Sequence, residues 1–264
     1  MTPSSAVSMI RFAGDAGAGG VRVVPEETPV AIVHDAVTYA VMMATPSDLT
    51  DFAVGFSLTE GVITSVDEVR AMETVETDLG VEVRLWLAPG RAAALAGRRR
   101  MLAGPTGCGL CGIESLEQAV RPPTRAPADL AVLSREHIHQ AMEALTAVQS
   151  LGRETRAVHA AGFWRPGEGL VAAREDVGRH NAVDKLAGAL ALAEEDPAGV
   201  LVLTSRVSVE LVQKASVMGI PVIAAVSAPT SLAIRTAAAA GITLIAVVRQ
   251  DGFEVFTRGD RLAP

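Results

Sequence analysis

Two cysteines, Cys108 and Cys111, are the residues of this chain best suited to covalent chemistry. They are the only cysteines among its 264 residues and stand in the run Gly-Cys-Gly-Leu-Cys-Gly. The glycines loosen the backbone around both thiols, which suits an exposed and mobile sulfur better than a packed core. Such a pair can bind zinc, cycle between dithiol and disulfide, or carry sulfur as a persulfide.

Each of these three uses requires different residues or structure around the cysteines. A structural zinc site has four ligands, and no second Cys-x-x-Cys occurs, so histidines or a second subunit would have to supply the rest. A thioredoxin-like dithiol usually follows a β-strand, whereas residues 102–107 show no strand pattern. A persulfide carrier needs a thiolate that attacks a donor persulfide and a loop that moves the captured sulfur. We favour sulfur carriage, although composition alone leaves the other two uses open.

A second polar passage, Arg-Glu-Asp-Val-Gly-Arg-His-Asn-Ala-Val-Asp-Lys, occupies residues 174–185. A helix is predicted to begin near Gly178, which places His180 and Asn181 in its first turn. The N-terminus of a helix attracts anions, so these two side chains could contact a phosphate or a nucleotide. They could equally be structural hydrogen-bonding groups, and the residues alone do not choose between the two roles.

The last third of the chain has the clearest structural pattern. Short β-rich runs at 200–204, 221–226 and 242–248 alternate with helical segments that end at Gly219 and Gly241, which predicts a β-α-β-α-β unit. Strands linked in this way are parallel, and ligands generally bind beyond their carboxyl ends. The polar residues that follow the three strands are Ser205 and Arg206, then Ser227 and Thr230, then Arg249, Gln250, Asp251 and Gly252. Ser227 or Thr230 could instead cap the next helix.

The run His159-Ala-Ala161 is similar to the His-x-Glu element of zinc-dependent nucleoside deaminases. Ala161 stands where those enzymes need a proton-transferring glutamate, and both cysteines lie upstream of His159 rather than downstream, as the deaminase signature requires. Deamination is therefore excluded by the residues, and we predict no metal held by side chains.

The chain is predicted to fold as two unequal domains. Residues 1–20 are rich in Gly and Ala and are expected to be disordered, and residues 21–127 form a smaller β-rich α+β domain that ends in the mobile cysteine loop. The proline-rich run at 121–127 cannot continue a helix or a central strand. It therefore marks the boundary to an α/β domain at 128–264.

Within these domains, apolar spacing predicts individual elements. Strands are expected at 30–33, 39–43 and 81–87, and Ser47 and Asp48 are expected to cap the helix between the second and third of them. In the second domain, Ser134 is expected to cap a helix, and further elements are a strand at 170–173 and a long helix at 178–193.

Composition excludes several classes of protein. The formal charge is -7 and the isoelectric point is about 5.3, which argues against a protein that binds the backbone of DNA or RNA. No apolar run is long enough to cross a membrane, and residues 1–20 lack the pattern of an export signal. We expect a cytoplasmic protein with no nucleic-acid or membrane partner.

Four passages together resemble the formate dehydrogenase accessory sulfurtransferase family, FdhD. They are Cys108-Gly-Leu-Cys-Gly, the run from Glu175 to Lys185, Ser205-Arg-Val-Ser and Ser227-Ala-Pro-Thr, in the order and spacing of that family. Met43-Ala-Thr-Pro and Gly55-Phe-Ser-Leu-Thr-Glu-Gly look like its N-terminal signatures. The resemblance therefore covers residues 26–256.

The resemblance implies a sulfurtransferase that takes sulfur from a cysteine desulfurase as a persulfide on Cys108, with Cys111 assisting. The implied acceptor is the molybdenum or tungsten bis-molybdopterin guanine dinucleotide cofactor of formate dehydrogenase. Its guanine nucleotide is expected near 247–252, which includes Val247 and Val248, in the crevice at the strand ends. The family also implies a homodimer and, for the C-terminal domain, a cytidine-deaminase-like three-layer fold with a largely parallel sheet.

Two positions depart from the family pattern. Val247 stands where members commonly have phenylalanine, and Phe256 where tyrosine is usual, so a stacked ring and a hydroxyl are missing; Arg249 is retained. Two other functions are carried as alternatives. One is a non-catalytic chaperone that binds the molybdenum cofactor and formate dehydrogenase without moving sulfur, and the other is a dimer linked by zinc.

Overall fold

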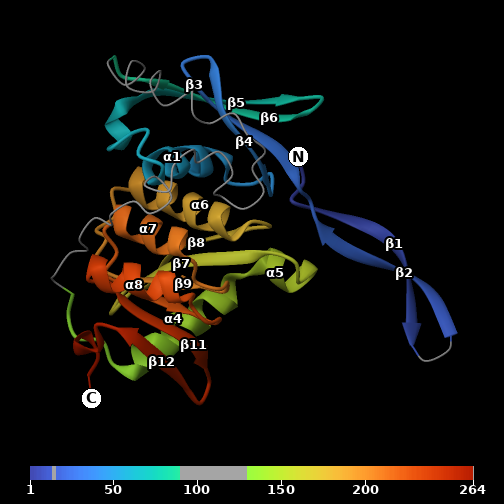
Figure 1. The fold of residues 1–264 in the computed structure, drawn as a ribbon. Coiled ribbons are helices and arrows are strands. Elements are labelled where there is room, and N and C mark those ends of the chain that lie inside the picture. Colours follow the sequence, from blue (N-terminus) through green and yellow to red (C-terminus); the bar gives the residue numbers. More distant parts are fainter. Residues whose placement is uncertain (14–15, 90–129, 264) are drawn as a thin grey trace.

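The computed structural model of this protein describes residues 1–13, 16–89 and 130–263. Cys108 and Cys111 lie outside these residues, as does the predicted domain boundary at 121–127. The described elements form an extended two-stranded arm and two sheets with helices between them, and one more helical layer covers the second sheet (Figure 1). The fold is thus of the mixed α/β class.

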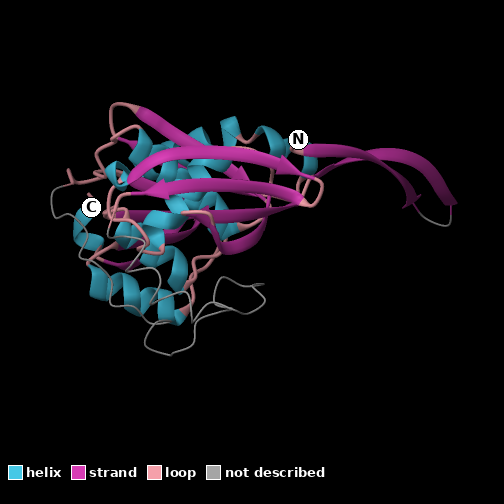
Figure 2. Cartoon of the chain, turned by 90° about the horizontal axis from the view of Figure 1, so that it is seen from above, coloured by secondary structure: helices cyan, strands magenta, loops and turns pink. Residues whose placement is uncertain are grey.

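The arm consists of β1 (Ser4–Ala13) and β2 (Ala16–Pro25), which pair in an antiparallel register. Figure 2 shows it running out beyond the rest of the chain. Disorder was predicted for residues 1–20, and the structure instead has this hairpin. Glycine and serine interrupt the apolar alternation of these strands, which made them hard to predict. Ile10 and Phe12 nevertheless lie on one face. The Phe12 ring is close to the position that a side chain at Gly17 would take.

The first sheet has the strand order β4-β3-β6-β5. Its strands are β3 (Thr28–His34), β4 (Val37–Ala44), β5 (Val69–Thr77) and β6 (Gly80–Leu87), and the elements between β4 and β5 are α1 (Leu49–Thr59) and the short helix η1 (Val66–Glu68). β3 and β6 are parallel neighbours, and the outer pairs are antiparallel. Ile32, Phe52 and Val83 are fully buried where α1 covers one face of the sheet. The predicted strands at 30–33, 39–43 and 81–87 are confirmed.

The second sheet has six strands in the order β12-β11-β10-β9-β7-β8. Its strands are β7 (His159–Arg165), β8 (Gly169–Asp176), β9 (Val200–Leu203), β10 (Val222–Ala225), β11 (Thr243–Arg249) and β12 (Gly252–Thr257). Only β9, β10 and β11 are parallel neighbours, as the β-α-β-α-β pattern predicted. Because β7 and β12 pair in antiparallel fashion, the sheet is mixed rather than largely parallel.

Helices cover both faces of this sheet. The second unit contains α4 (Arg135–Val148), α5 (Ser150–Thr155), α6 (Arg179–Leu192), α7 (Val209–Val217), α8 (Ser231–Ala240) and the short helix η2 (Gly259–Arg261). Alternate residues of one strand face opposite layers: Phe163 packs in the core with α6, α7 and α8, whereas Trp164 packs in the core with α4. The three-layer arrangement is present, while its likeness to deaminases stays a prediction because layering alone does not identify that fold.

Two predicted helix starts differ in their capping. The Ser134 hydroxyl accepts from the His137 amide, and His137 Nδ1 accepts from the Ser134 amide, both at 3.2 Å, so the predicted cap is confirmed as a capping box. Asp48 is the N-cap of α1, as predicted. It adopts a left-handed backbone with φ of 52°, and its side chain makes no capping hydrogen bond.

The two sheets are joined by a close crossing of α1 and α6, which lie side by side between them in Figure 1. A side chain at Gly55 would overlap the Asp184 carbonyl, and one at Gly188 would overlap the Asp51 carbonyl. Glycine at both positions therefore lets the two helix backbones approach directly. This contact fixes the first sheet on the helical layer of the second.

Candidate functional site

The carboxyl ends of the three parallel strands bring most of the predicted site residues together. Val207 and Pro229 form a bridge between the segments that follow β9 and β10, and the Thr230 amide donates to the Val207 carbonyl at 3.0 Å. Arg249 Nη1 donates to the Val226 carbonyl at 2.6 Å, which links the end of β11 to the end of β10. Ser205, Arg206, Ser227, Thr230 and Arg249 thus lie along one edge of the sheet, as predicted.

The side chains along this edge differ in what they are free to do. The Thr230 hydroxyl accepts from the Ala233 amide at 3.2 Å, so it caps α8, the second of its two predicted roles. Ser205 is 3 % exposed and donates to the Arg206 carbonyl at 3.2 Å. The Arg206 and Arg249 side chains are exposed, and exposed guanidinium groups are suited to phosphate or carboxylate groups.

Residues 247–252 comprise the end of β11, the turn after it and the first residue of β12. Arg249 pairs with Gly252 across this hairpin, and Gln250 and Asp251 are exposed at its turn. Val247 has a left-handed backbone with φ of 53° at an irregularity in the pairing. Val248 was predicted to contact the nucleotide, but its side chain is buried in the core beneath α4, so only its backbone is available for such a contact.

The 174–185 passage turns out to hold the two sheets together. Asp176 and Lys185 are both fully buried, and their charged atoms are 2.7 Å apart. Asp176 also accepts from the Thr45 amide at 3.0 Å, while Lys185 donates to the Thr45 carbonyl at 2.9 Å. Asn181 donates to the Met43 carbonyl and to Asp176. Asn181 was predicted to bind cofactor or to be structural, and its 3 % exposure and these bonds favour the structural role.

A second buried pair spans the same boundary. Lys214 of α7 lies 2.7 Å from Asp184 of α6, and Thr59 of α1 donates to Asp184 at 2.6 Å. Burial raises the pKa of Asp184 above its ordinary value, against the opposing effect of Lys214. Sequence reasoning did not identify Thr59 or Lys214 as partners of Asp184. Thr59 is more than one hundred positions away from Asp184, and Lys214 lies on a different helix.

His180 points to a different group of side chains, at the same edge of the sheet as Ser205. His180 Nε2 lies 3.8 Å from Glu210 Oε2, and the two side chains are 12 % and 15 % exposed. Arg179 and His159 lie nearby: burial, with the charges of Arg179 and His180, lowers the pKa of His159. His180 is also the main cause that lowers the pKa of Glu210 to about 2, against the effect of burial, so Glu210 is a carboxylate.

Four atoms of this group are buried and make no hydrogen bond within the part of the chain that the structure describes. They are Arg179 Nε, His180 Nε2, Ser208 Oγ and Glu210 Oε2. Two of them, His180 Nε2 and Glu210 Oε2, nevertheless face each other as an ion pair at 3.8 Å, so these two buried polar atoms have each other as partners. Sequence reasoning missed Glu210 and included Ser208 only as the last residue of the Ser205-Arg-Val-Ser passage, not as a site residue. The available signal was a serine followed by an acidic residue at a helix start.

The described ranges offer neither a cluster of metal ligands nor a helix that could span a membrane. Residues 1–13, 16–89 and 130–263 contain no group of three or more His, Cys, Asp or Glu side chains placed to hold a metal ion. Ala161 is fully buried in β7, so no carboxylate takes the deaminase position. None of the helices described is both long and apolar enough to span a membrane.

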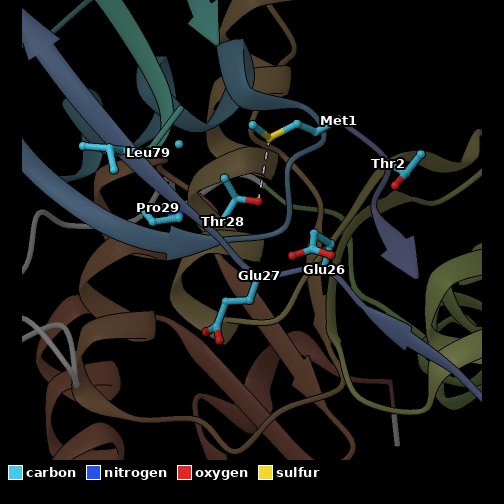
Figure 3. A pocket seen from close by; sticks show the side chains of 8 residues that line it. Met1, Thr2, Glu26, Glu27, Thr28, Pro29 and Leu79 are labelled. Carbon is cyan, nitrogen blue, oxygen red and sulfur yellow. Dashed lines mark hydrogen bonds between the residues drawn. The ribbon is translucent and has the colours of Figure 1, made fainter. Parts of the chain in front are cut away.

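A pocket of about 390 Å³ lies at the root of the arm, apart from the strand edge (Figure 3). It is lined by Met1, Thr2, Glu26, Glu27, Thr28, Pro29, Leu79 and Gly80. The dashed line in Figure 3 marks the Thr28 hydroxyl donating to the Met1 sulfur at 4.0 Å. The pocket is open and contains none of the predicted site residues, so we assign it no chemistry.

Comparison with known proteins places these features in a family. The model of the FdhD/NarQ family matches residues 25–263. The sulfur carrier protein FdhD of Agrobacterium fabrum is 56% identical over 246 residues, which cover 93% of this chain and 91% of the relative. The protein of the same name from Brucella abortus is 52% identical over 245 residues, with 91% and 90% covered.

A solved structure agrees with this assignment. The crystal structure of a candidate formate dehydrogenase accessory protein from Desulfotalea psychrophila superimposes with a TM-score of 0.77 and 25% sequence identity. The match covers 98% of this chain and 99% of that chain. With a family model that matches nearly the whole chain and relatives above half identity, the chain belongs to the FdhD/NarQ family.

Proposed function

We propose that this protein is a sulfur carrier that serves formate dehydrogenase, with Cys108 as the residue that carries the sulfur. The observation that carries the proposal is that more than half of the aligned residues are identical to those of proteins named sulfur carrier proteins. In addition, the two cysteines of the chain stand in one glycine-rich run. Supporting evidence is the fold, which matches that of a candidate formate dehydrogenase accessory protein.

In the proposed reaction, a cysteine desulfurase presents its own persulfide to Cys108. The Cys108 thiolate attacks the outer sulfur, the donor's sulfur–sulfur bond breaks, and the donor cysteine leaves as a thiolate while a new persulfide forms on Cys108. A thiolate is required because the protonated thiol is a poor nucleophile. Cys111 is proposed to assist by exchange or protection, which a neighbouring thiol can do.

The acceptor is proposed to be the molybdenum or tungsten bis-molybdopterin guanine dinucleotide cofactor, bound as a substrate. The edge formed by the carboxyl ends of β9, β10 and β11 is where ligands of parallel sheets usually bind. Arg206 and Arg249 offer exposed guanidinium groups there for phosphate oxygens. Ser227 and the hairpin at 249–252 adjoin them. We extend the proposal to a homodimer in the cytoplasm, on the resemblance to the family.

The test of sulfur carriage is the mass of the intact protein after incubation with a cysteine desulfurase and cysteine. The wild-type chain and a Cys111→Ala variant should each gain one sulfur atom on Cys108, and Cys108→Ala should gain none at that position. A Cys108→Ala protein that carries sulfur as well as the wild type would refute the assignment.

A second experiment separates carriage from mere cofactor binding. In a strain that lacks the wild-type protein, Cys108→Ala should fail to restore formate dehydrogenase activity although the variant is expressed and folded. Full activity in that strain would instead favour the non-catalytic chaperone. Metal analysis of the purified full-length protein tests the zinc-linked dimer, which requires stoichiometric zinc.

A further inference from the structure

The arm presents an apolar face that the described residues leave open. Ile10 and Phe12 alternate along β1, and Val21 shares their face because it lies opposite Ser8 in the antiparallel register. These three apolar residues are 68 %, 74 % and 68 % exposed. Apolar side chains that are exposed side by side usually mark a surface that another molecule covers.

The body of the same copy does not cover this face, because the arm runs away from it (Figures 1 and 2). Close to the arm's root, Arg22 donates to the Thr155 carbonyl of α5 at 3.2 Å, and the Glu26 amide donates to the Pro3 carbonyl at 2.8 Å. These bonds fix the direction of the arm. A two-stranded hairpin by itself is marginally stable in water, so the arm needs a further surface to pack against.

The pocket at the root of the arm matches the tip of the arm in size and in apolar character (Figure 3). Met1, Pro29 and Leu79 form its apolar lining, and Leu79 is 87 % exposed. The volume of about 390 Å³ falls in the range of cavities that enclose a ring-sized group. An aromatic side chain such as that of Phe12 therefore fits there.

The charges of the two surfaces are complementary. Glu26 and Glu27 line the pocket, and Glu27 is exposed. The described residues of β1 and β2 include no acidic side chain, and exposed Arg11 stands next to Phe12 at the tip. A basic apolar tip and an acidic apolar pocket attract each other, and their charges fix how they meet.

Symmetry brings a tip to a root without further assumptions. Each strand of the arm has ten residues, a length of about 33 Å. When two arms of equal length pack about a two-fold axis that runs across them, the tip of each lies at the root of the other. The chain thus supplies both surfaces, and a second copy satisfies both of them twice.

We propose that the arms of two copies pack against each other, with Phe12 of one copy in the root pocket of the other and Arg11 beside Glu27 of that other copy. The homodimer proposed above rests on resemblance alone, whereas the arm precedes residue 25, at which the family match begins. The proposed contact does not involve Cys108, so its failure would leave sulfur carriage standing.

Sedimentation equilibrium of the full-length protein tests the apolar contact. The wild type should be a dimer, and Phe12→Ser should weaken the dimer at least about a hundredfold, because the contact occurs twice. Leu79→Ser changes the pocket without touching the arm and should weaken the dimer in the same direction. Val148→Ser, at an exposed position on α4, is the control and should have no effect.

A charge exchange tests the pairing itself. Arg11→Glu and Glu27→Arg should each weaken the dimer at least about tenfold, and the protein that carries both substitutions should regain most of the lost affinity. Arg11 lies opposite Ala18, nine residues from Glu27, so the two side chains of one copy are about 30 Å apart along the arm. The recovery therefore requires contact between copies.

Three results would overturn the proposal. The first is a wild-type protein that is a monomer at every concentration tested. The second is a dimer whose affinity is unchanged in both Phe12→Ser and Leu79→Ser, and the third is a charge exchange that restores nothing. A monomer that needs Phe12 to bind a cysteine desulfurase or formate dehydrogenase would assign the arm to that partner instead.

Discussion

Lys185 and Asp176 show how much of the 174–185 passage is committed to holding the fold. Both side chains are fully buried, and Lys185 also donates to the carbonyl of Thr45, which directly follows β4 of the first sheet. Replacing Lys185 by methionine keeps the length of the side chain but leaves the Asp176 carboxylate without its counter-ion. We expect a loss of about 3 kcal/mol in the free energy of unfolding, measured by urea denaturation.

The matched control for that variant is an exposed ion pair. Arg258 and Asp260 are 2.7 Å apart with 41% and 62% of their side chains exposed. Arg258→Ala should therefore cost less than about 1 kcal/mol. Equal effects of the two substitutions would show that the buried pair is not a structural tie.

Glu210 makes stability depend on pH in a predictable direction. Its pKa is lowered from the ordinary 4.5 to about 2, chiefly by His180, so the unfolded chain takes up this proton at a higher pH than the folded one. The stability that it contributes is complete above pH 4.5 and is lost as the pH falls toward 2. The difference in unfolding free energy between wild type and Glu210→Gln should shrink by about 2 kcal/mol from pH 6 to pH 2, which is less than the full conversion of the pKa change because solvent screens this partly exposed pair. Urea titrations at each pH measure it, and a constant difference would contradict the assignment.

At the scale of elements, the crossing of α1 and α6 is the contact least tolerant of change. A side chain at Gly188 would overlap the Asp51 carbonyl of the facing helix, so Gly188→Ala must push the helices apart. We expect a cost of more than about 2 kcal/mol, although alanine favours the helix itself by about 1 kcal/mol. Thermal and urea unfolding of the variant measure the loss.

Gly19 provides the comparison for that substitution. It lies in β2 with nothing within 4 Å of the position that a side chain would take. Gly19→Ala should change the free energy of unfolding by less than about 0.5 kcal/mol. If both alanine variants were equally stable, the close approach of α1 and α6 would not limit the fold.

Local patterns predicted the elements that carry local signals. Short apolar runs separated by helical segments that end at Gly219 and Gly241 predicted β9, β10 and β11. Ser134 predicted the start of α4. Both kinds of signal depend on only a few neighbouring residues. Strand direction is not local, so the antiparallel β7 and β12 were not foreseen. The hydrogen bonds from Thr45 to Asp176 and from Thr59 to Asp184 could not be predicted either, because each joins residues more than one hundred positions apart.

The candidate site divides in the same way. The strand ends at Ser205, Arg206 and Arg249 were predicted because a parallel β-α-β unit gathers them at one edge whatever the details. Asn181 could not be assigned from sequence, because a buried and a ligand-binding asparagine at a helix start look alike. Glu210 was missed because an acidic residue in the first turn of a helix is expected for electrostatic reasons alone.

For the whole molecule, we expect the two sheets to unfold together, because the contacts between them are buried. Two buried ion pairs cross between the units: Asp176–Lys185 bonds to Thr45, which directly follows β4, and Asp184–Lys214 bonds to Thr59 of α1. The helix crossing adds direct backbone contact. Separating the sheets would expose these charges and the α6 surface together, so partial unfolding of either sheet is strongly disfavoured.

The two tryptophans of the chain allow a direct test of this cooperativity. Trp86 lies in β6 of the first sheet, and Trp164 is buried in β7 of the second. Trp164→Phe leaves a fluorescent reporter only in the first sheet, and Trp86→Phe leaves one only in the second. In each variant we expect the fluorescence transition in urea to coincide with that of far-UV circular dichroism, which reports mainly on the helices. Transitions that separate in either variant would mean that the predicted division into two domains is also a division in stability, and that α1 and α6 merely touch.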